Sequence, residues 1–389
     1  MRHSVGAGKS RAWYNDMSKS DSSAAQPSAN LRRLRRAIAT LLLLVLSAGL
    51  ACSVGKKPAP VAVVRIAFVG TLSPEGKPLV TGTGARVAEE GWLEQELAKC
   101  GTSLRWVAMP GAAVGPMTNE AFANGGIDFA GYSELPSIIA NSNGIHTKLI
   151  VPTGRGVDTF LVVPVDSQAT SIHDLKGKKI AVHKGRPWEL PFIRLLDSER
   201  LSYDDFNVMN LNPEVGVAAL SAKKVDALVI TTTAYLLEKK GLGRILWSTT
   251  DKSLEWKTVG GIWGSADFVE KHPDLTQLVS TAYVRAYHWA SQDDNRAEVI
   301  RLFARNGTPE DIVAREYSEG GLSWKERWSP MFDEGLYEHY RSAIALAASK
   351  KIIPGPFDFR QSADDRFVLR AVQDLGIAGY WSASPPRIR

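Results

Sequence analysis

The sequence predicts an α/β fold in which mostly parallel sheets are flanked by helices. From residue 61 onward, short apolar stretches typical of strands alternate with stretches whose apolar residues recur at helical spacing. The length of 389 residues allows about two domains. Because 44% of the residues are hydrophobic and 23% are charged, the composition is that of a soluble globular protein.

These patterns place the expected strands and helices along the chain. Apolar runs predict strands at residues 61–69, 104–108, 127–130, 149–152, 160–163, 180–182, 207–210 and 227–230. Helical spacing or turn signals predict helices at 85–98, 117–123, from about 134, 187–196 and 215–222. From residue 267 to about residue 350 the pattern becomes mostly helical. We find no internal repeat.

The segment 171–188 combines a short strand, a glycine turn and the start of a helix. Lys184 and Gly185 form the turn, and Pro187 stands where a helix would take its first residue. A helix N-terminus presents unpaired N–H groups that suit an anion, and Arg186 adds a cation beside it. The alternative is an ordinary strand-to-helix turn with solvated basic residues, and the local pattern leaves both interpretations open.

The positive charge of the chain belongs to its N-terminus. Of the 47 Lys and Arg and 41 Asp and Glu that give a net charge of +6, residues 1–51 hold eight and two. The remainder has 39 of each and no net charge. This balance excludes a nucleic-acid or membrane-surface partner for the body of the protein.

Residues 1–51 are predicted to be a disordered N-terminus that ends in a signal peptide. Four arginines precede the apolar run 37–46, and small residues lead up to Cys52. A cysteine directly after such a leader looks like a bacterial lipoprotein acceptor, but cleavage after Ala51 by an ordinary signal peptidase is also open. An uncleaved anchor is the weaker alternative. Residues 52–60 are expected to form a linker.

The sequence offers little for metal or catalytic chemistry. If Cys52 is lipidated, only Cys100 remains, which excludes a disulfide framework and a CxxC site. The seven histidines show no HExxH motif and no paired spacing, so we expect no metal and no cofactor. His183 beside Lys184 could act as a base, but a structural role is favoured, and an enzyme is not expected.

Four short motifs occur in an order that resembles a known family. The run DLKGKKIAV at 174–182 is followed by KG, and the other runs are NGGIDF at 124–129, KKVDA at 223–227 and EKHPD at 270–274. Together they are similar to periplasmic solute-binding proteins of ABC importers, in the aliphatic sulfonate, taurine and nitrate group. The match covers about residues 61–360.

The resemblance implies a two-lobed fold of type II with two hinge crossings. Lobe 1 would take residues 61–155 and, with the C-terminal helices, 261–389, while 156–260 would form the hinge and lobe 2. The crossings would lie near 156–159 and 256–260. The expected protein is a periplasmic monomer, with a lipid anchor at Cys52 left open, whose partners are a small anionic solute and an ABC permease in the inner membrane.

The resemblance also implies which turns contact the ligand, since ligands bind at the carboxyl ends of strands in open α/β sheets. The candidate residues are Thr71, Leu72, Thr83, Tyr132, Ser133, Glu134, Arg155, Lys184, Gly185, Arg186, Trp188, Thr231, Thr232 and Trp263.

Several of these candidate residues could instead have a purely structural role. Ser133 and Glu134 could merely cap a helix, the threonines could do the same, and Trp263 could be a core residue. At the turn of Lys184 and Gly185, Arg186 and Pro187 stand where the family has small hydroxyl residues, which argues against a simple sulfonate cradle.

We therefore expect the substrate-binding subunit of an ABC transporter, which captures an aliphatic sulfonate-like anion in an interlobe cleft and delivers it to the permease. The alternatives are a binder of nitrate or of a thiamine precursor, an exported sensor, and an exported enzyme on the same fold.

Overall fold

The computed structural model describes residues 60–111, 114–319 and 321–381. The chain divides into two units, residues 1–57 and 58–389, and every described residue belongs to the second. The predicted signal peptide, Cys52 and most of the linker lie outside the described residues. Within the described part, no helix is both long and apolar enough to cross a membrane.

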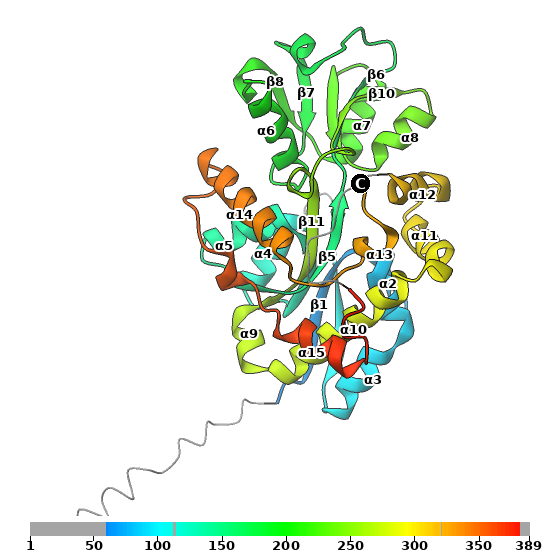
Figure 1. Ribbon diagram of the computed structural model, residues 1–389, viewed down its shortest axis with the longest axis vertical. Helices are drawn as coiled ribbons and strands as arrows, with labels where there is room; N and C mark the ends of the chain where they lie inside the picture. The colour runs from blue at the N-terminus through cyan, green and yellow to red at the C-terminus, as the bar shows by residue number, and fades with distance from the viewer. Residues whose placement is uncertain (1–59, 112–113, 320, 382–389) are drawn as a thin grey trace, which may run out of the picture. The chain divides into compact units, whose positions relative to one another are not determined.

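The first sheet forms lobe 1 (Figure 1). Its main strands run in the order β3 (Ser103–Met109), β1 (Val63–Leu72), β4 (Phe129–Ser133), β11 (Thr258–Ser265) and β5 (Thr147–Val157), and β2 (Pro78–Val80) pairs with the end of β1. β1 is parallel to β3 and to β4, whereas β11 runs antiparallel to β4 and β5. Thus β1, β3, β4 and β5 all end at the same edge, which faces the second sheet.

The second sheet forms lobe 2. Its order is β10 (Gly243–Ser248), β6 (Phe160–Pro164), β9 (Ala227–Ile230), β7 (Lys179–Val182) and β8 (Asn207–Asn210). β7 is parallel to β8 and β9, and β6 is antiparallel to β9 and β10. Since β6 leaves the junction with lobe 1, the strands β7, β8 and β9 end there.

Helices cover both faces of each sheet (Figure 1). Lobe 2 carries α6 (Glu189–Ser198), α7 (Pro213–Ser221) and α8 (Thr233–Lys239). Lobe 1 carries α2 (Gly82–Glu90), α3 (Trp92–Lys99), α4 (Val114–Ala123), α5 (Glu134–Ser142), α9 (Ala266–Lys271), α10 (Pro273–Ala290), α11 (Arg296–Ala304), α12 (Glu310–Ser318), α13 (Trp324–Arg327), α14 (Glu334–Ser349) and α15 (Arg366–Asp374).

Strand alternation divides the lobe 1 core between the two faces of its sheet. Along β1, Val64, Ile66 and Phe68 enter the core beneath α2, α3 and α10, while Ala67 enters the core beneath α4, α5 and α14. Successive strand residues point to opposite faces, so a continuous apolar run is required where both faces are covered. The fold class expected from the sequence, two α/β lobes with two crossings, is confirmed.

The stretch between β1 and β3 differs from the sequence prediction. The helix expected at 85–98 is broken into α2 and α3 at Gly91, whose φ of +65° is a left-handed conformation that glycine adopts without a steric penalty. The stretch before α2 forms β2, which folds back on β1 as a hairpin.

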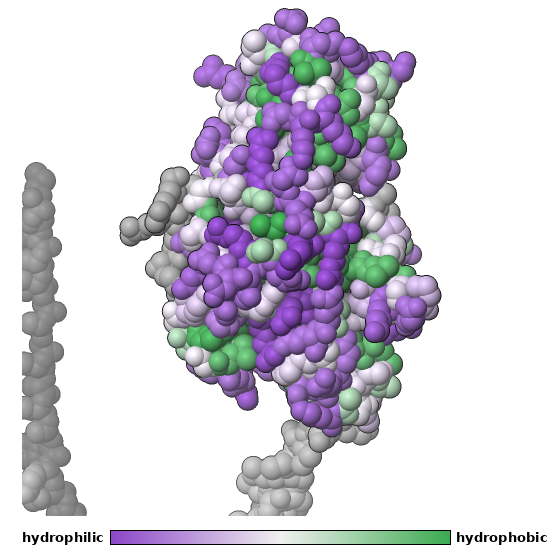
Figure 2. Space-filling model, turned by 90° about the vertical axis from the view of Figure 1, so that its right-hand side faces the viewer, coloured by the Kyte–Doolittle hydropathy of each residue, from purple (hydrophilic) through white to green (hydrophobic). Residues whose placement is uncertain are grey.

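The surface in Figure 2 is mostly hydrophilic, and its hydrophobic residues lie in separate patches.

Helix α12 belongs to the lobe 1 part of the sequence but packs on lobe 2. Ile312 is buried in the lobe 2 core with Phe160 and Leu237. Arg315 Nη1 donates to Glu238 at 2.8 Å, and the Tyr235 hydroxyl donates to Glu319 at 2.7 Å. On the other flank, Leu190 of α6 lies in the lobe 1 core beneath α14.

The two crossings are joined by a buried ion pair. Lys257 of the second crossing lies 2.5 Å from Asp158 of the first, and neither side chain is more than 4% exposed. The Lys257 ammonium also donates to the carbonyls of Thr249 and Thr250, at 2.8 and 2.9 Å. Asp158 accepts a further hydrogen bond from the Thr249 hydroxyl. All three ammonium donors are therefore satisfied, as a buried charge requires.

Substitution of Lys257 by Met is expected to destabilise the protein by about 3–5 kcal/mol, because it leaves Asp158 buried without its counter-charge. Urea unfolding would measure the free energy of unfolding. The double substitution Lys257→Met with Asp158→Leu should restore much of the loss. Lys223→Met is the control, since Lys223 and Asp166 form an exposed pair worth about 1 kcal/mol or less. Equal effects of the two single substitutions would contradict this account.

Candidate functional site

The turn after β7 lies at the junction of the lobes, but its backbone N–H is already engaged. Gly185 has a φ of +75°, and its N–H donates to Glu189 Oε2 at 2.5 Å. The other carboxylate oxygen of Glu189 accepts from the Tyr203 hydroxyl at 3.0 Å. Burial raises the pKa of Glu189. The Glu189 carboxylate thus accepts the hydrogen bond that the sequence analysis expected a ligand anion to accept.

Helix α6 also starts later than predicted. The sequence analysis placed Pro187 at the first helical residue, whereas α6 begins at Glu189 and Trp188 is its N-cap. Pro187 therefore belongs to the turn, where it removes one backbone donor.

Three polar atoms at this turn have no hydrogen-bond partner among the described residues. They are Nε of Arg186, Nε1 of Trp188 and Nδ1 of His183, and all three are buried atoms. The Arg186 guanidinium lies 5.0 Å from the centre of the Trp188 ring and makes no ion pair within the described chain. Burial lowers the pKa of Arg186, and Glu214 partly opposes this shift. Because an unpaired buried donor costs free energy, this group favours an anionic acceptor.

Lys184 lies on the outer side of the same turn. Its side chain is exposed, its ammonium is 5.0 Å from the centre of the Tyr203 ring, and its backbone N–H donates to Asn210. Lys184 can add positive potential to the junction, but its head group is solvated rather than buried.

Thr231 and Thr232 follow β9 at the same edge. Thr232 is the N-cap of α8 with no side-chain capping bond, so the alternative of a simple cap is not realised. Its side chain instead lies close to Glu316 of α12, and burial raises the pKa of Glu316 to about 7. The loop after β9 in lobe 2 therefore lies next to a carboxylate of α12, a helix that follows the second crossing in the sequence.

Glu134 is a buried carboxyl at the end of β4. It is 1% exposed, its Oε2 accepts from the N–H of Val259 at 3.1 Å, and its Oε1 lies 4.0 Å from His339 Nε2. Burial raises the pKa of Glu134 to about 8 and lowers the pKa of His339 to about 4. At neutral pH both groups are therefore uncharged. Ser133 is the N-cap of α5 but makes no side-chain capping bond.

Three other predicted site residues are packed inside lobe 1. Arg155 is fully buried, where it pairs with Asp333 and donates to the Met331 carbonyl. Trp263 is 1% exposed and packs with its ring centre 6.0 Å from that of Tyr132. A ligand could reach Arg155 or Trp263 only if core contacts separated, so the structure gives both a packing role.

The remaining candidates lie at the end of β1 and in α2. Thr71 and Leu72 are exposed at the tip of the β1–β2 hairpin. Thr83, in the first turn of α2, lies close to the hydroxyl of Tyr287.

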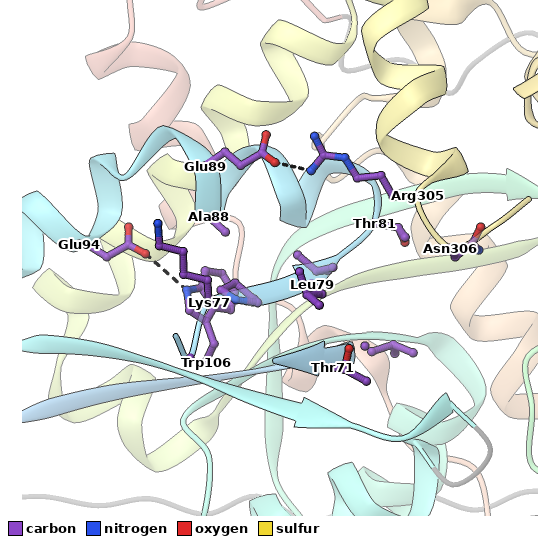
Figure 3. A pocket seen from close by; sticks show the side chains of 15 residues that line it. Thr71, Lys77, Leu79, Thr81, Ala88, Glu89, Glu94, Trp106, Arg305 and Asn306 are labelled. Atoms are coloured by element: carbon purple, nitrogen blue, oxygen red, sulfur yellow. Dashed lines mark hydrogen bonds and ion pairs between the residues drawn. The ribbon is translucent and has the colours of Figure 1, made fainter. Parts of the chain in front are cut away.

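Thr71 lines a cavity of about 1020 Å³ that lobe 1 builds alone (Figure 3). Trp106 lies in its wall with Lys77 nearby, and Arg305 pairs with Glu89 across another part of the wall. No residue of the lobe 2 turns lines it. Of the predicted candidates, Thr71 thus lines this cavity, whereas those on the lobe 2 turns lie at the junction.

Sequence reasoning missed the residues that hold the junction together. Asp158 and Lys257 sit inside the two predicted crossings, but nothing in the sequence pairs residues so far apart. Glu189 could have been suspected, because an acidic residue in the first turn of a helix suits its N-terminus.

Among the described residues, no group of three or more His, Cys, Asp or Glu is arranged to hold a metal ion.

The raised pKa of Glu134 predicts a loss of stability with rising pH. The folded state keeps the proton up to about pH 8, whereas an unfolded glutamic acid releases it near 4.5. Stability is therefore present at low pH and falls by about 1.4 kcal/mol per unit until the folded group also ionises. Between pH 6.5 and 8, the wild type should lose about 2 kcal/mol relative to Glu134→Gln. Urea unfolding at several pH values measures this, and parallel curves for the two proteins would refute it.

Three comparisons place this architecture among known proteins. The family model described as NMT1/THI5 like matches residues 112–297. A putative aliphatic sulfonates-binding protein of Bacillus subtilis (strain 168) is 25% identical over 295 residues, which are 75% of this chain and 85% of the relative.

Solved structures agree with this placement. The alkanesulfonate-binding protein SsuA from Xanthomonas axonopodis pv. citri bound to MOPS is 23% identical, with a TM-score of 0.62 over 79% of this chain and 99% of that one, and shows the fold. The putative periplasmic sulfonate-binding protein SsuA from Methylobacillus flagellatus KT is 42% identical, with a TM-score of 0.74 over 85% of this chain and 98% of that one. The present chain therefore belongs to the family of periplasmic solute-binding proteins of ABC importers, in its aliphatic sulfonate, taurine and nitrate group.

Proposed function

We propose that this protein is the extracytoplasmic substrate-binding subunit of an ABC importer. It captures a small anionic solute, an aliphatic sulfonate or a close analogue, at the junction of its two lobes and delivers it to a membrane permease. The observation that carries this proposal is the unpaired, half-buried guanidinium of Arg186 beside Trp188. The relatives named for sulfonate binding support the choice of anion.

In this protein a side chain supplies the anion contact that backbone groups would otherwise make. Pro187 has no N–H, and the N–H of Gly185 is held by Glu189. Arg186 compensates, because its fork of donors matches the oxygens of a sulfonate. The Trp188 ring fixes the plane of the guanidinium.

The surroundings of Arg186 fit binding better than catalysis. His183 is the nearest candidate base, and burial together with the Arg186 charge lowers its pKa. Within the described part of the chain we find no nucleophile hydrogen-bonded to it. An uncharged imidazole there can contact the ligand without transferring a proton.

Delivery to a permease requires that the ligand change the arrangement of the lobes. The lobes are joined by two crossings, and contacts such as Lys350–Asp197 and Arg194–Ser342 bridge their flanks. A ligand that touches both lobes stabilises the arrangement in which these flanks meet.

Arg186→Gln should weaken sulfonate binding by about 1.5–3 kcal/mol, the usual worth of a hydrogen bond to a charged group. This corresponds to a dissociation constant raised roughly tenfold to more than a hundredfold. Calorimetry with ethanesulfonate and with MOPS would measure it.

Lys178→Gln is the matched control, since Lys178 is an exposed cation just before the opposite end of β7. Similar affinities for the Arg186 variant and the wild type would remove Arg186 from the site. Tight binding of a cationic solute, with none of either sulfonate, would reject the anion proposal.

The export part of the proposal rests on the leader sequence. We expect the mature protein to begin at Cys52 and to carry an acyl-modified cysteine in the membrane fraction. Intact-mass spectrometry of the protein from that fraction would show the added acyl mass. A soluble periplasmic form with unmodified Cys52 would contradict lipidation and leave export intact.

A further inference from the structure

Two arginines lie around a small cavity on lobe 1, away from the junction of the lobes. Arg86 comes from α2 and Arg285 from α10, two helices that lie side by side (Figure 1). The cavity measures about 310 Å³, is open to solvent, and is also lined by His288, Gln292, Leu375 and Ile377. No residue of lobe 2 or of either crossing lines it.

Tryptophan rings hold both guanidinium groups in place. The Arg86 guanidinium carbon lies 4.6 Å from the centre of the Trp289 ring, and that of Arg285 lies 5.0 Å from the centre of the Trp92 ring. Stacking of this kind fixes the plane of a guanidinium and leaves its edge free to donate hydrogen bonds.

The charges around this cavity are not balanced. Arg285 pairs through Nη2 with Glu90, the one carboxylate that lines the cavity. Arg86 has no ion pair within the described residues, and the Nε atoms of both arginines are buried without a hydrogen-bond partner. Two guanidinium charges therefore face one carboxylate, and two buried donors lack an acceptor, which costs free energy.

Arg86 shares its features with Arg186 at the proposed ligand site. Both are half-buried, both stack on a tryptophan, and both have a buried Nε without a partner. We propose that the cavity between Arg86 and Arg285 is a second anion site, which holds one small oxyanion such as inorganic sulfate or phosphate. Its volume suits such an ion, and guanidinium forks match the oxygens geometrically.

The proposal does not depend on the ligand of the interlobe site, so its test uses protein that carries Arg186→Gln. Sodium sulfate is titrated into this protein while the arginine Nε–H resonances are followed by ¹H–¹⁵N NMR. The resonance of Arg86, identified by its loss in Arg86→Lys, should shift saturably. A further Arg86→Gln substitution should weaken sulfate binding about tenfold or more.

Arg105→Gln is the control, because Arg105 is exposed on β3 and lines no cavity described here; it should leave sulfate affinity unchanged. Arg86→Lys keeps the charge but not the fork, so it should bind with intermediate affinity, and its melting curve checks the fold. An Arg86 resonance that does not move with sulfate, or equal affinities in the Arg86→Gln and Arg105→Gln proteins, would overturn the proposal.

Discussion

The ion pair between Lys257 and Asp158 is the contact on which the two-lobed arrangement depends. It ties the segment that leaves lobe 1 to the segment that returns, and its remaining hydrogen bonds go to Thr249 and Thr250 at the start of the loop after β10. Because both charges are buried, each can persist only while the other is present. The crossings therefore behave as one unit, and the carboxyl ends of the strands in both lobes stay directed at the same space.

At that space, the proposed anion contact comes from a side chain rather than from backbone groups. Glu189 satisfies the turn of Gly185 internally, which makes the turn rigid but removes it as an anion site. Arg186 then carries the positive charge, with an indole beneath it. The charge-assisted contact that results depends on one residue, so affinity for the anion should be unusually sensitive to substitution there.

The fold could be predicted because most of its strands are short apolar runs that lie buried. The strand at 227–230 coincides with β9, whose residues are all buried, and the strand at 207–210 coincides with β8, which is mostly exposed. The site could be predicted only in part, since local patterns do not show which side chains become partners across the fold. Arg155 was expected to face a ligand but pairs with Asp333, 178 residues away. Trp263 was expected at a ligand but fills the core beneath α14, because β11 is covered on that face.

Helix α12 shows that lobe 2 is built from two separate parts of the sequence. Ile312 completes the core of lobe 2, although the chain on both sides of this helix returns to lobe 1. A fragment containing only the residues between the two crossings would expose the apolar surface that Ile312 covers, and Arg315 and Glu319 would be missing from its edge. Lobe 2 is thus not an autonomous folding unit: its last piece is supplied by a segment synthesised after the chain has already crossed back.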